Sequence, residues 1–132
     1  MRNLVDTSGW LEYMTNGPNA ELFASAIEDT HYLVVPTISV LEVFRWVLRE
    51  RGESDALQAT AMMQQGMVVD LDAALALKAA KLGNGLKLPL ADSVIYATAR
   101  EFNALLWTQD DHFNGLPDVE YHPKYQPPTS SR

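Results

Sequence analysis

Short apolar runs that alternate with longer segments of helical spacing constrain the fold of this chain more than any other feature. The expected strands are residues 3–6, 32–35, 67–70, 104–107 and 119–122. Between them, helical spacing of apolar residues predicts helices at residues 9–15, 20–29, 39–51, 55–65, 73–82 and 90–102. This order predicts an α/β fold with a mainly parallel central sheet of about five strands, covered by helices on both faces.

Proline and glycine mark the expected helix ends. Pro18 and Pro89 stand near helix starts, and Gly52 and Gly83 stand near helix ends. Parallel strands that are joined by helices end at one edge of their sheet, and ligands of such folds bind beyond that edge. Residues that follow the strands are therefore the first candidates for a functional site.

The chain has 132 residues, of which 47% are apolar, and this is enough for one domain with its own core. We expect that domain to span residues 1–122. Residues 123–132 contain several prolines and are expected to form an extended or disordered tail without a chemical role. The first residues include charges and no long apolar run, so we expect neither a signal peptide nor a membrane span.

The chain contains no cysteine, which excludes disulfides, thiolate metal ligands and cysteine nucleophiles. Any metal must therefore be held by oxygen or imidazole, and this composition suits a reducing cytoplasm. The formal net charge of −7 argues against a module that wraps nucleic acid nonspecifically, because such binding depends on lysine and arginine. It argues less against a metal-dependent nuclease, since bound cations reverse the charge where a phosphate must sit.

Four acidic residues stand among apolar neighbours or at the ends of expected strands: Asp6, Glu42, Asp92 and Asp110. Burying an unpaired carboxylate costs on the order of a few kcal/mol, unless it is protonated, hydrogen-bonded or bound to a cation. Asp6 and Asp110 end strands, whereas Glu42 and Asp92 lie in early helical turns, so all could meet at one edge of the sheet. A cluster of oxygen ligands suits Mg²⁺ or Mn²⁺.

Each of these acids also has a purely local explanation. Asp6 could cap a helix, and Glu42 could form a capping box with Ser39. Asp92 could complement the dipole of a helix that begins near Pro89, and Asp110 could fix a turn through its side chain. These explanations are independent of one another, whereas a shared metal site accounts for all of the acids at once.

Four segments resemble, in the same order, the motifs of PIN domains: DTSGWL at 6–11, SVLEV at 39–43, LADSVIYATA at 90–99 and TQDDHF at 108–113. The resemblance extends from near residue 3 to about residue 122 and leaves only the tail outside. It implies a three-layer α/β/α, Rossmann-like fold and the hydrolysis of RNA. It also implies a Mg²⁺ or Mn²⁺ site made by Asp6, Glu42, Asp92 and Asp110.

The small size of the chain is similar to that of the VapC-type toxins within this family. The resemblance therefore implies an RNA substrate, a cognate antitoxin protein that holds the toxin inactive, and a homodimer. The alternative is a non-catalytic PIN-like interaction domain, which would have no need of these acids. Receiver and dehalogenase-like domains are excluded, because Asp6 is followed by Thr7 and Ser8 rather than by the acidic pattern that those domains require.

Several neighbours of the acids are further candidates. Asp111 adjoins Asp110, and the motif favours Asp110 as the ligand. The hydroxyls of Ser8 and Thr108 could orient carboxylates or a metal-bound water, or could make only local hydrogen bonds. His112 is interpreted as a solvated surface histidine.

Arg45 and Arg49 follow Glu42 on roughly the same helical face. There they could guide an RNA strand toward the site, or they could form only an exposed basic helix end.

Overall fold

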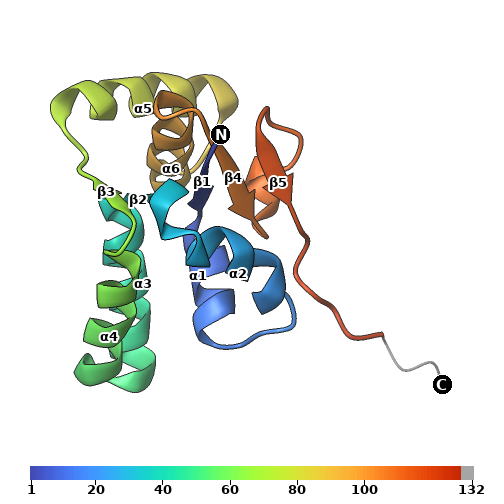
Figure 1. Cartoon of the computed structure of the whole chain (residues 1–132). Helices are drawn as coiled ribbons and strands as arrows, with labels where there is room; N and C mark the ends of the chain where they lie inside the picture. Colours follow the sequence, from blue (N-terminus) through green and yellow to red (C-terminus); the bar gives the residue numbers. More distant parts are fainter. Residues whose placement is uncertain (129–132) are drawn as a thin grey trace.

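Five parallel strands form the centre of the structure, a computed structural model that describes residues 1–128 (Figure 1). The strands are β1 (Arg2–Val5), β2 (Leu33–Pro36), β3 (Met67–Val69), β4 (Ala104–Thr108) and β5 (Val119–Tyr121). They are arranged in the order β3-β2-β1-β4-β5, and every neighbouring pair is parallel. The predicted parallel sheet is confirmed.

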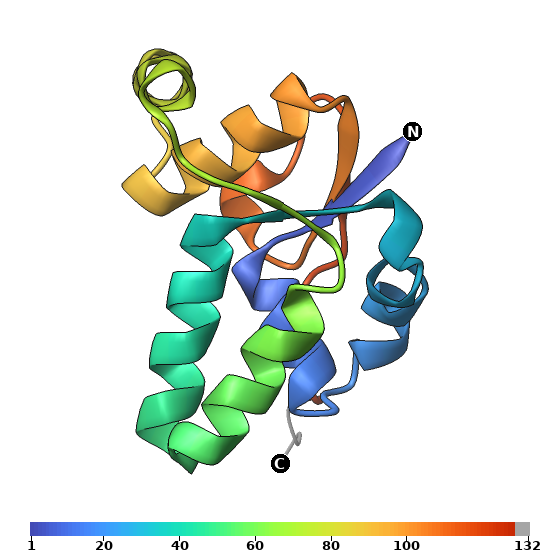
Figure 2. The ribbon, with the colours of Figure 1, turned by 60° about the vertical axis from the view of Figure 1, so that its left-hand side comes forward.

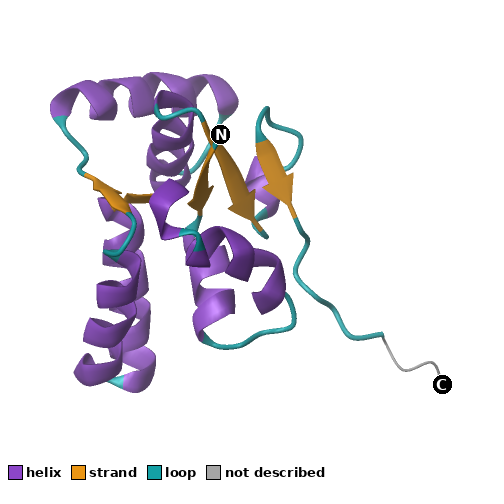
Figure 3. Ribbon diagram, in the orientation of Figure 1, coloured by secondary structure: helices purple, strands orange, loops and turns teal. Residues whose placement is uncertain are grey.

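Helices cover both faces of the sheet (Figure 3). They are α1 (Thr7–Met14), α2 (Ala20–Glu28), α3 (Thr37–Arg51), α4 (Glu53–Met63), α5 (Ala73–Leu86) and α6 (Leu90–Glu101), with short 3₁₀ turns η1 (Thr30–Tyr32) and η2 (Asp111–Phe113). In Figure 2, α3 and α4 lie side by side as an antiparallel pair that extends beyond the sheet. The predicted three-layer α/β/α fold is confirmed.

The core has two parts because neighbouring side chains on a strand point to opposite faces. Val5 and Val35 pack with Trp10 and Phe23 under α1 and α2. One residue earlier on each strand, Leu4 and Val34 pack on the other face, in the cluster beneath α6 that also contains Ile95, Tyr96 and Leu106. This alternation fixes the register of the strands, and with it the positions of the residues that follow them.

Helix α3 begins at Thr37, two residues before the predicted start, and Pro36 is its N-cap. Proline has a backbone already suited to a helix start and lacks the N–H that such a position leaves unpaired. Ser39 is therefore inside the helix and fully buried, and its Oγ has no hydrogen-bond partner within residues 1–128. The capping box of Ser39 and Glu42 is wrong.

Helix α5 also differs from the prediction, since it continues through Gly83 to Leu86. Its C-cap is Lys87, whose φ of +58° is left-handed. Gly83 therefore does not end the helix, and it packs closely against Ser93 of α6. A Cβ at this position would lie 2.6 Å from Cβ of Ser93 and would overlap its hydroxyl. The glycine thus allows α5 and α6 to approach each other.

Residues 123–128 form neither helix nor strand, and residues 129–132 of the predicted tail lie outside the described residues. Within residues 1–128, no helix is long and apolar enough to cross a membrane.

Replacing Gly83 by alanine is expected to destabilise the protein by about 1–3 kcal/mol, because the added methyl group overpacks the α5–α6 contact. Gly85 is a matched control in the same helix, since a methyl group at this position would point into open space. Gly85→Ala should be neutral or stabilise by up to about 1 kcal/mol. Urea unfolding measures both, and equal effects of the two variants would contradict the proposed close contact.

Candidate metal centre

Asp6 follows β1 at the carboxyl edge of the sheet and is only 2% exposed. Its Oδ1 accepts hydrogen bonds from the Ser8 hydroxyl at 2.7 Å and from the backbone N–H of Gly9 at 3.0 Å. Its Oδ2 accepts one from the Thr108 hydroxyl at 2.7 Å. Asp6 is therefore the N-cap of α1, as its local explanation required, and it is also the carboxylate that both candidate hydroxyls hold in place.

Hydrogen bonds also connect the chain after β4 to the two hydroxyls that bind Asp6. Thr108 Oγ1 accepts a hydrogen bond from the backbone N–H of Asp110 at 2.9 Å, and Ser8 Oγ accepts one from the backbone N–H of Gln109 at 3.2 Å. The two hydroxyls thus connect Asp6 to the chain that carries Asp110. Because β1 and β4 are neighbours, the ends of both strands open on one site.

Asp92, in the first turn of α6, lies at the same edge. Its Oδ2 is 3.0 Å from Nδ1 of His112, and that nitrogen is also 3.0 Å from Oδ1 of Asp110. Within the described residues, Asp92, Asp110 and His112 form a group whose ligand atoms all lie within 4.8 Å of one another. The side chain of Asp110 also accepts a hydrogen bond from the backbone N–H of His112. This bond fixes the turn that was predicted at Asp110.

His112 is the residue that sequence reasoning passed over. Its side chain is 54% exposed, as the surface interpretation required, but its ring nitrogen lies between two of the candidate carboxylates. The negative charge of Asp110 raises the pKa of His112 above its ordinary value, and Asp92 adds to this effect. The signal in the sequence was the spacing Asp110-x-His112 across a tight turn.

The carboxylates disturb one another's ionisation. Burial raises the pKa of Asp6 to about 6, with a smaller contribution from the charge of Asp110. Burial, with smaller contributions from the charges of Asp110 and Asp6, likewise raises the pKa of Asp92 to about 6. Carboxylates that repel one another at one edge of the sheet are a set of oxygen donors that fits Mg²⁺ or Mn²⁺.

Glu42 reaches this region through a different contact. Its Oε1 accepts a hydrogen bond from the Thr7 hydroxyl at 2.6 Å, and Thr7 directly follows Asp6. Glu42 nevertheless lies outside the compact group of ligand atoms that the described residues form. The structure therefore brings Asp92 and Asp110 together, places Asp6 within reach of their charges, and connects Glu42 to them through the start of α1.

The two candidate arginines of α3, Arg45 and Arg49, lie away from the compact group. Arg45 is exposed and lines a hollow with Leu41 and Phe44 on the outer side of α3. Arg49 is exposed and forms an ion pair with Glu50 at 3.0 Å. Neither contacts a candidate ligand within residues 1–128.

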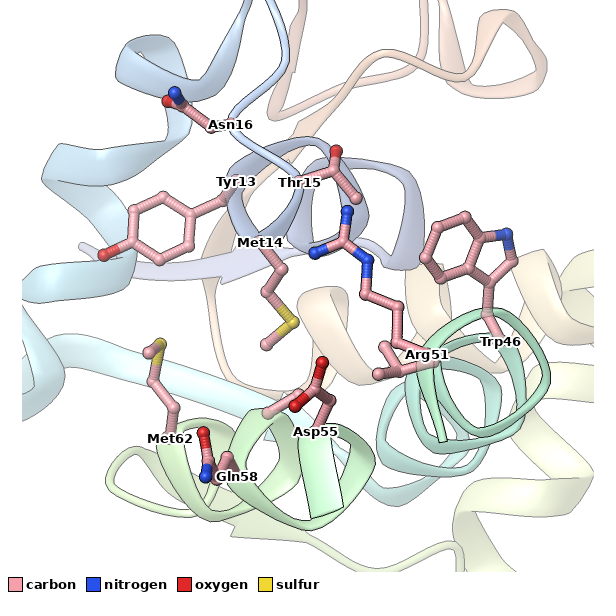
Figure 4. A pocket seen from close by; sticks show the side chains of 11 residues that line it. Tyr13, Met14, Thr15, Asn16, Trp46, Arg51, Asp55, Gln58 and Met62 are labelled. Atoms are coloured by element: carbon pink, nitrogen blue, oxygen red, sulfur yellow. The ribbon is translucent and has the colours of Figure 1, made fainter. Parts of the chain in front are cut away.

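A cavity of about 540 Å³ lies between α1 and the α3–α4 pair (Figure 4). Tyr13, Met14, Trp46 and Met62 give it a partly apolar lining, and Arg51 and Asp55 add charge. None of the four predicted ligands lines it. The cavity is therefore separate from the candidate carboxylates.

Comparison with known proteins gives one match to a family: the sequence model of the PIN domain matches residues 4–119. No curated protein sequence matches the chain.

Several solved structures have the same fold. A chain of a toxin–antitoxin complex from Klebsiella pneumoniae superposes with a TM-score of 0.78 and 20% identity, over 93% of this chain and 99% of that one. VapBC2 from Rickettsia felis, bound to a DNA fragment from its promoter, superposes with a TM-score of 0.71 and 15% identity. The match covers 93% of this chain and 98% of that one. VapC20 from Mycobacterium tuberculosis, a toxin that cleaves the sarcin-ricin loop, superposes with a TM-score of 0.70 and 16% identity. The match covers 86% of this chain and 94% of that one.

Replacing Asp92 by asparagine should stabilise the metal-free protein at pH 7. The raised pKa means that the folded state binds a proton more readily than the unfolded state, whose carboxyl has the ordinary value of 3.8. The associated stability is present below pH 3.8 and is lost as the pH rises through about 6. Asp92→Asn should recover about 1–2 kcal/mol at pH 7 and much less at pH 4.

Thermal unfolding in EDTA at both pH values measures this difference. Asp111→Asn is the matched control, because Asp111 is an exposed neighbour outside the compact group. A destabilised Asp92→Asn variant at pH 7 would contradict the repulsion among the carboxylates.

Proposed function

The chain belongs to the PIN domain family, and on that basis we propose that it is a divalent-metal-dependent endoribonuclease and the toxin of a toxin–antitoxin pair. The observation that carries this proposal is the meeting of Asp6, Asp92 and Asp110 at the carboxyl edge of the sheet, with raised pKa values for Asp6 and Asp92. A cation bound there would offset the negative charge of the carboxylates and favour the approach of a phosphate.

We assign the metal to Asp6, Glu42, Asp92 and Asp110. When bound, Mg²⁺ or Mn²⁺ would activate a water and stabilise the leaving oxygen of a phosphodiester. A carboxylate has about four acceptor sites, and Asp6 uses three of them for Ser8, Gly9 and Thr108. These donors fix the direction of the one site that remains on Oδ2, so Asp6 is oriented before any ligand arrives.

Asp92 and Asp110 lie nearer to solvent, and His112 bridges them. Its Nδ1 contacts both carboxylates, so its imidazole lies where a cation would relieve their repulsion. The exposed side chain of His112 can turn away, which would leave both carboxylates free to act as ligands. Ser8 and Thr108 act in this scheme as positioning residues for Asp6.

The proposed partners follow from the same similarities. VapBC complexes pair a toxin of this fold with an antitoxin, and this chain spans nearly the whole length of the matched chains. We propose a cognate antitoxin as the partner of this protein. The activity belongs in the cytoplasm, where RNA and an antitoxin are both present. A role of Arg45 and Arg49 in guiding RNA stays a prediction.

The proposal predicts cleavage of structured RNA by the purified protein with Mg²⁺ or Mn²⁺, and none in EDTA. Asp6→Asn and Asp92→Asn should each lower the rate on the order of 100-fold or more, because each removes a carboxylate that the cation requires. A panel of labelled RNAs separated on denaturing gels measures this rate.

Glu53→Gln, at an exposed glutamate of α4 that lines no hollow beside the carboxylates, serves as the control and should cut at the rate of the unaltered protein. Cleavage that survives EDTA or both substitutions would indicate a contaminating nuclease. If no RNA is cut and no Mn²⁺ binds, the chain is the non-catalytic PIN-like interaction domain.

We further propose that two copies of the chain associate through the outer surface of α3 and β3. Leu41 and Leu48 are 56% and 43% exposed and line a hollow of about 680 Å³ with Val68. Leu41→Glu should convert the dimer to a monomer in sedimentation experiments, because it places a charge in an apolar contact. Leu22→Glu, at an exposed leucine of α2, should leave the dimer intact. A monomer before any substitution would contradict this proposal.

A further inference from the structure

The segment that follows β5 is held against the candidate site. The backbone N–H of His122 donates a hydrogen bond to the carbonyl of Thr108 at 2.9 Å. One residue later, the carbonyl of Pro123 accepts a hydrogen bond from Nδ2 of Asn19 at 3.0 Å. In Figure 1, this segment leaves β5 at the carboxyl edge of the sheet. The chain after the last strand therefore starts from a fixed position beside the carboxylates.

A network of amides and one carboxylate fixes Asn19 itself. Its Nδ2 also donates to Oε1 of Gln109 at 3.1 Å, and Gln109 is only 7% exposed. Glu12 accepts the backbone N–H of Asn19 at 2.7 Å and lies 3.4 Å from Nε2 of Gln109. At Gly17 a side chain would collide with the Glu12 carboxylate, at 2.5 Å from its Cδ. The turn between α1 and α2 is thus built around this network.

Lys124 is the next residue, and it lines two hollows that meet beside Asp6. One hollow, of about 380 Å³, also contains Asp110 and Tyr121. The other, of about 320 Å³, also contains Thr7 and Trp46. Both share Ser8 and Gln109 with Lys124. Because the two hollows share these residues, they form one groove whose lining includes Trp46, Asp110 and Tyr121.

Lys124 supplies the positive charge of this groove. Among the lining residues that the structure describes, it is the one lysine or arginine in either hollow. It makes no ion pair with any carboxylate of residues 1–128, whereas Lys78 and Arg100 are both paired. The chain as a whole carries a formal charge of −7, so the positive charge of Lys124 favours the approach of a phosphate to this groove.

We propose that Lys124 binds a phosphate of the RNA next to the one that is cut, and that Asn19 and Gln109 are positioning residues for it. This inference rests on the proposed ribonuclease function and adds the residue that holds the substrate. The occupant is a single-stranded segment, because the half-buried rings of Trp46 and Tyr121 in the lining of the groove can each stack on an unpaired base. A segment for which the sequence predicted no chemical role thus forms one wall of the substrate groove.

The test measures RNA binding separately from cleavage. An Asp92→Asn background keeps the probe intact, and the probe is a fluorescein-labelled single-stranded RNA of about 12 nucleotides. Fluorescence anisotropy is recorded with Mg²⁺ at several KCl concentrations. Lys124→Gln should weaken binding about 3- to 10-fold at low salt and reduce the slope of log K against log salt by about 0.7, the loss of one phosphate contact.

Three further variants separate this role from a structural one. Lys124→Arg should retain the affinity, and Lys81→Gln, at an exposed lysine of α5, should not change it. Asn19→Ala should weaken binding in the Asp92→Asn background but have little further effect once Lys124 is glutamine, because both substitutions remove the same contact. An additive effect of Asn19→Ala would contradict its positioning role.

Unchanged affinity in Lys124→Gln would overturn the inference even if the unaltered protein cuts RNA. Tighter binding would also overturn it and would mean that the segment covers the groove instead of forming it. If the Asp92→Asn protein binds no probe and the unaltered protein cuts no RNA, the proposed ribonuclease function fails, and this inference fails with it.

Discussion

The hydrogen bonds that Ser8 and Thr108 donate to Asp6 join the ends of two neighbouring strands, and the candidate site depends on them. Asp6 is almost fully buried, and a buried carboxylate is tolerated only with partners of this kind. The same hydroxyls accept backbone N–H groups of Gln109 and Asp110. One buried acid thereby sets the path of the chain after β4, and with it the positions of Asp110 and His112.

The electrostatics of the site follow from this geometry. Asp92 is brought to the edge by α6 and faces Asp110, so each ionised carboxylate raises the cost of ionising the other. The metal-free protein partly relieves this repulsion with His112. A divalent cation would relieve it more completely, and this difference in stabilisation is the physical basis for metal binding. The groove that passes Lys124 then leads a polyanion to a site that would otherwise repel it.

The fold was largely predictable from the sequence because its signals are local. Short continuous apolar runs such as the one that contains Leu4 and Val5 predict strands that are buried on both faces, and these two side chains do pack on opposite faces of the sheet. The errors came from contacts between distant residues. Glycine is typical of a helix end, but Gly83 lies inside α5, where it leaves room for Ser93 of the next helix. Pro36 moved the start of α3, which made the predicted pairing of Ser39 with Glu42 impossible.

The site was predictable only in part, for the same reason. The residues that end strands were identified by position, because parallel strands bring their ends together. The contribution of His112 depends on a turn whose geometry the spacing only suggests, and the role of Lys124 depends on hydrogen bonds from Asn19, which is far away in the sequence. The central claim is that the carboxylates at this edge hold a divalent cation, and titration with Mn²⁺ followed by electron paramagnetic resonance tests it most directly. The account predicts saturable binding that Mg²⁺ displaces and that Asp110→Asn abolishes; absence of saturable binding, or binding unaffected by Asp110→Asn, would contradict it.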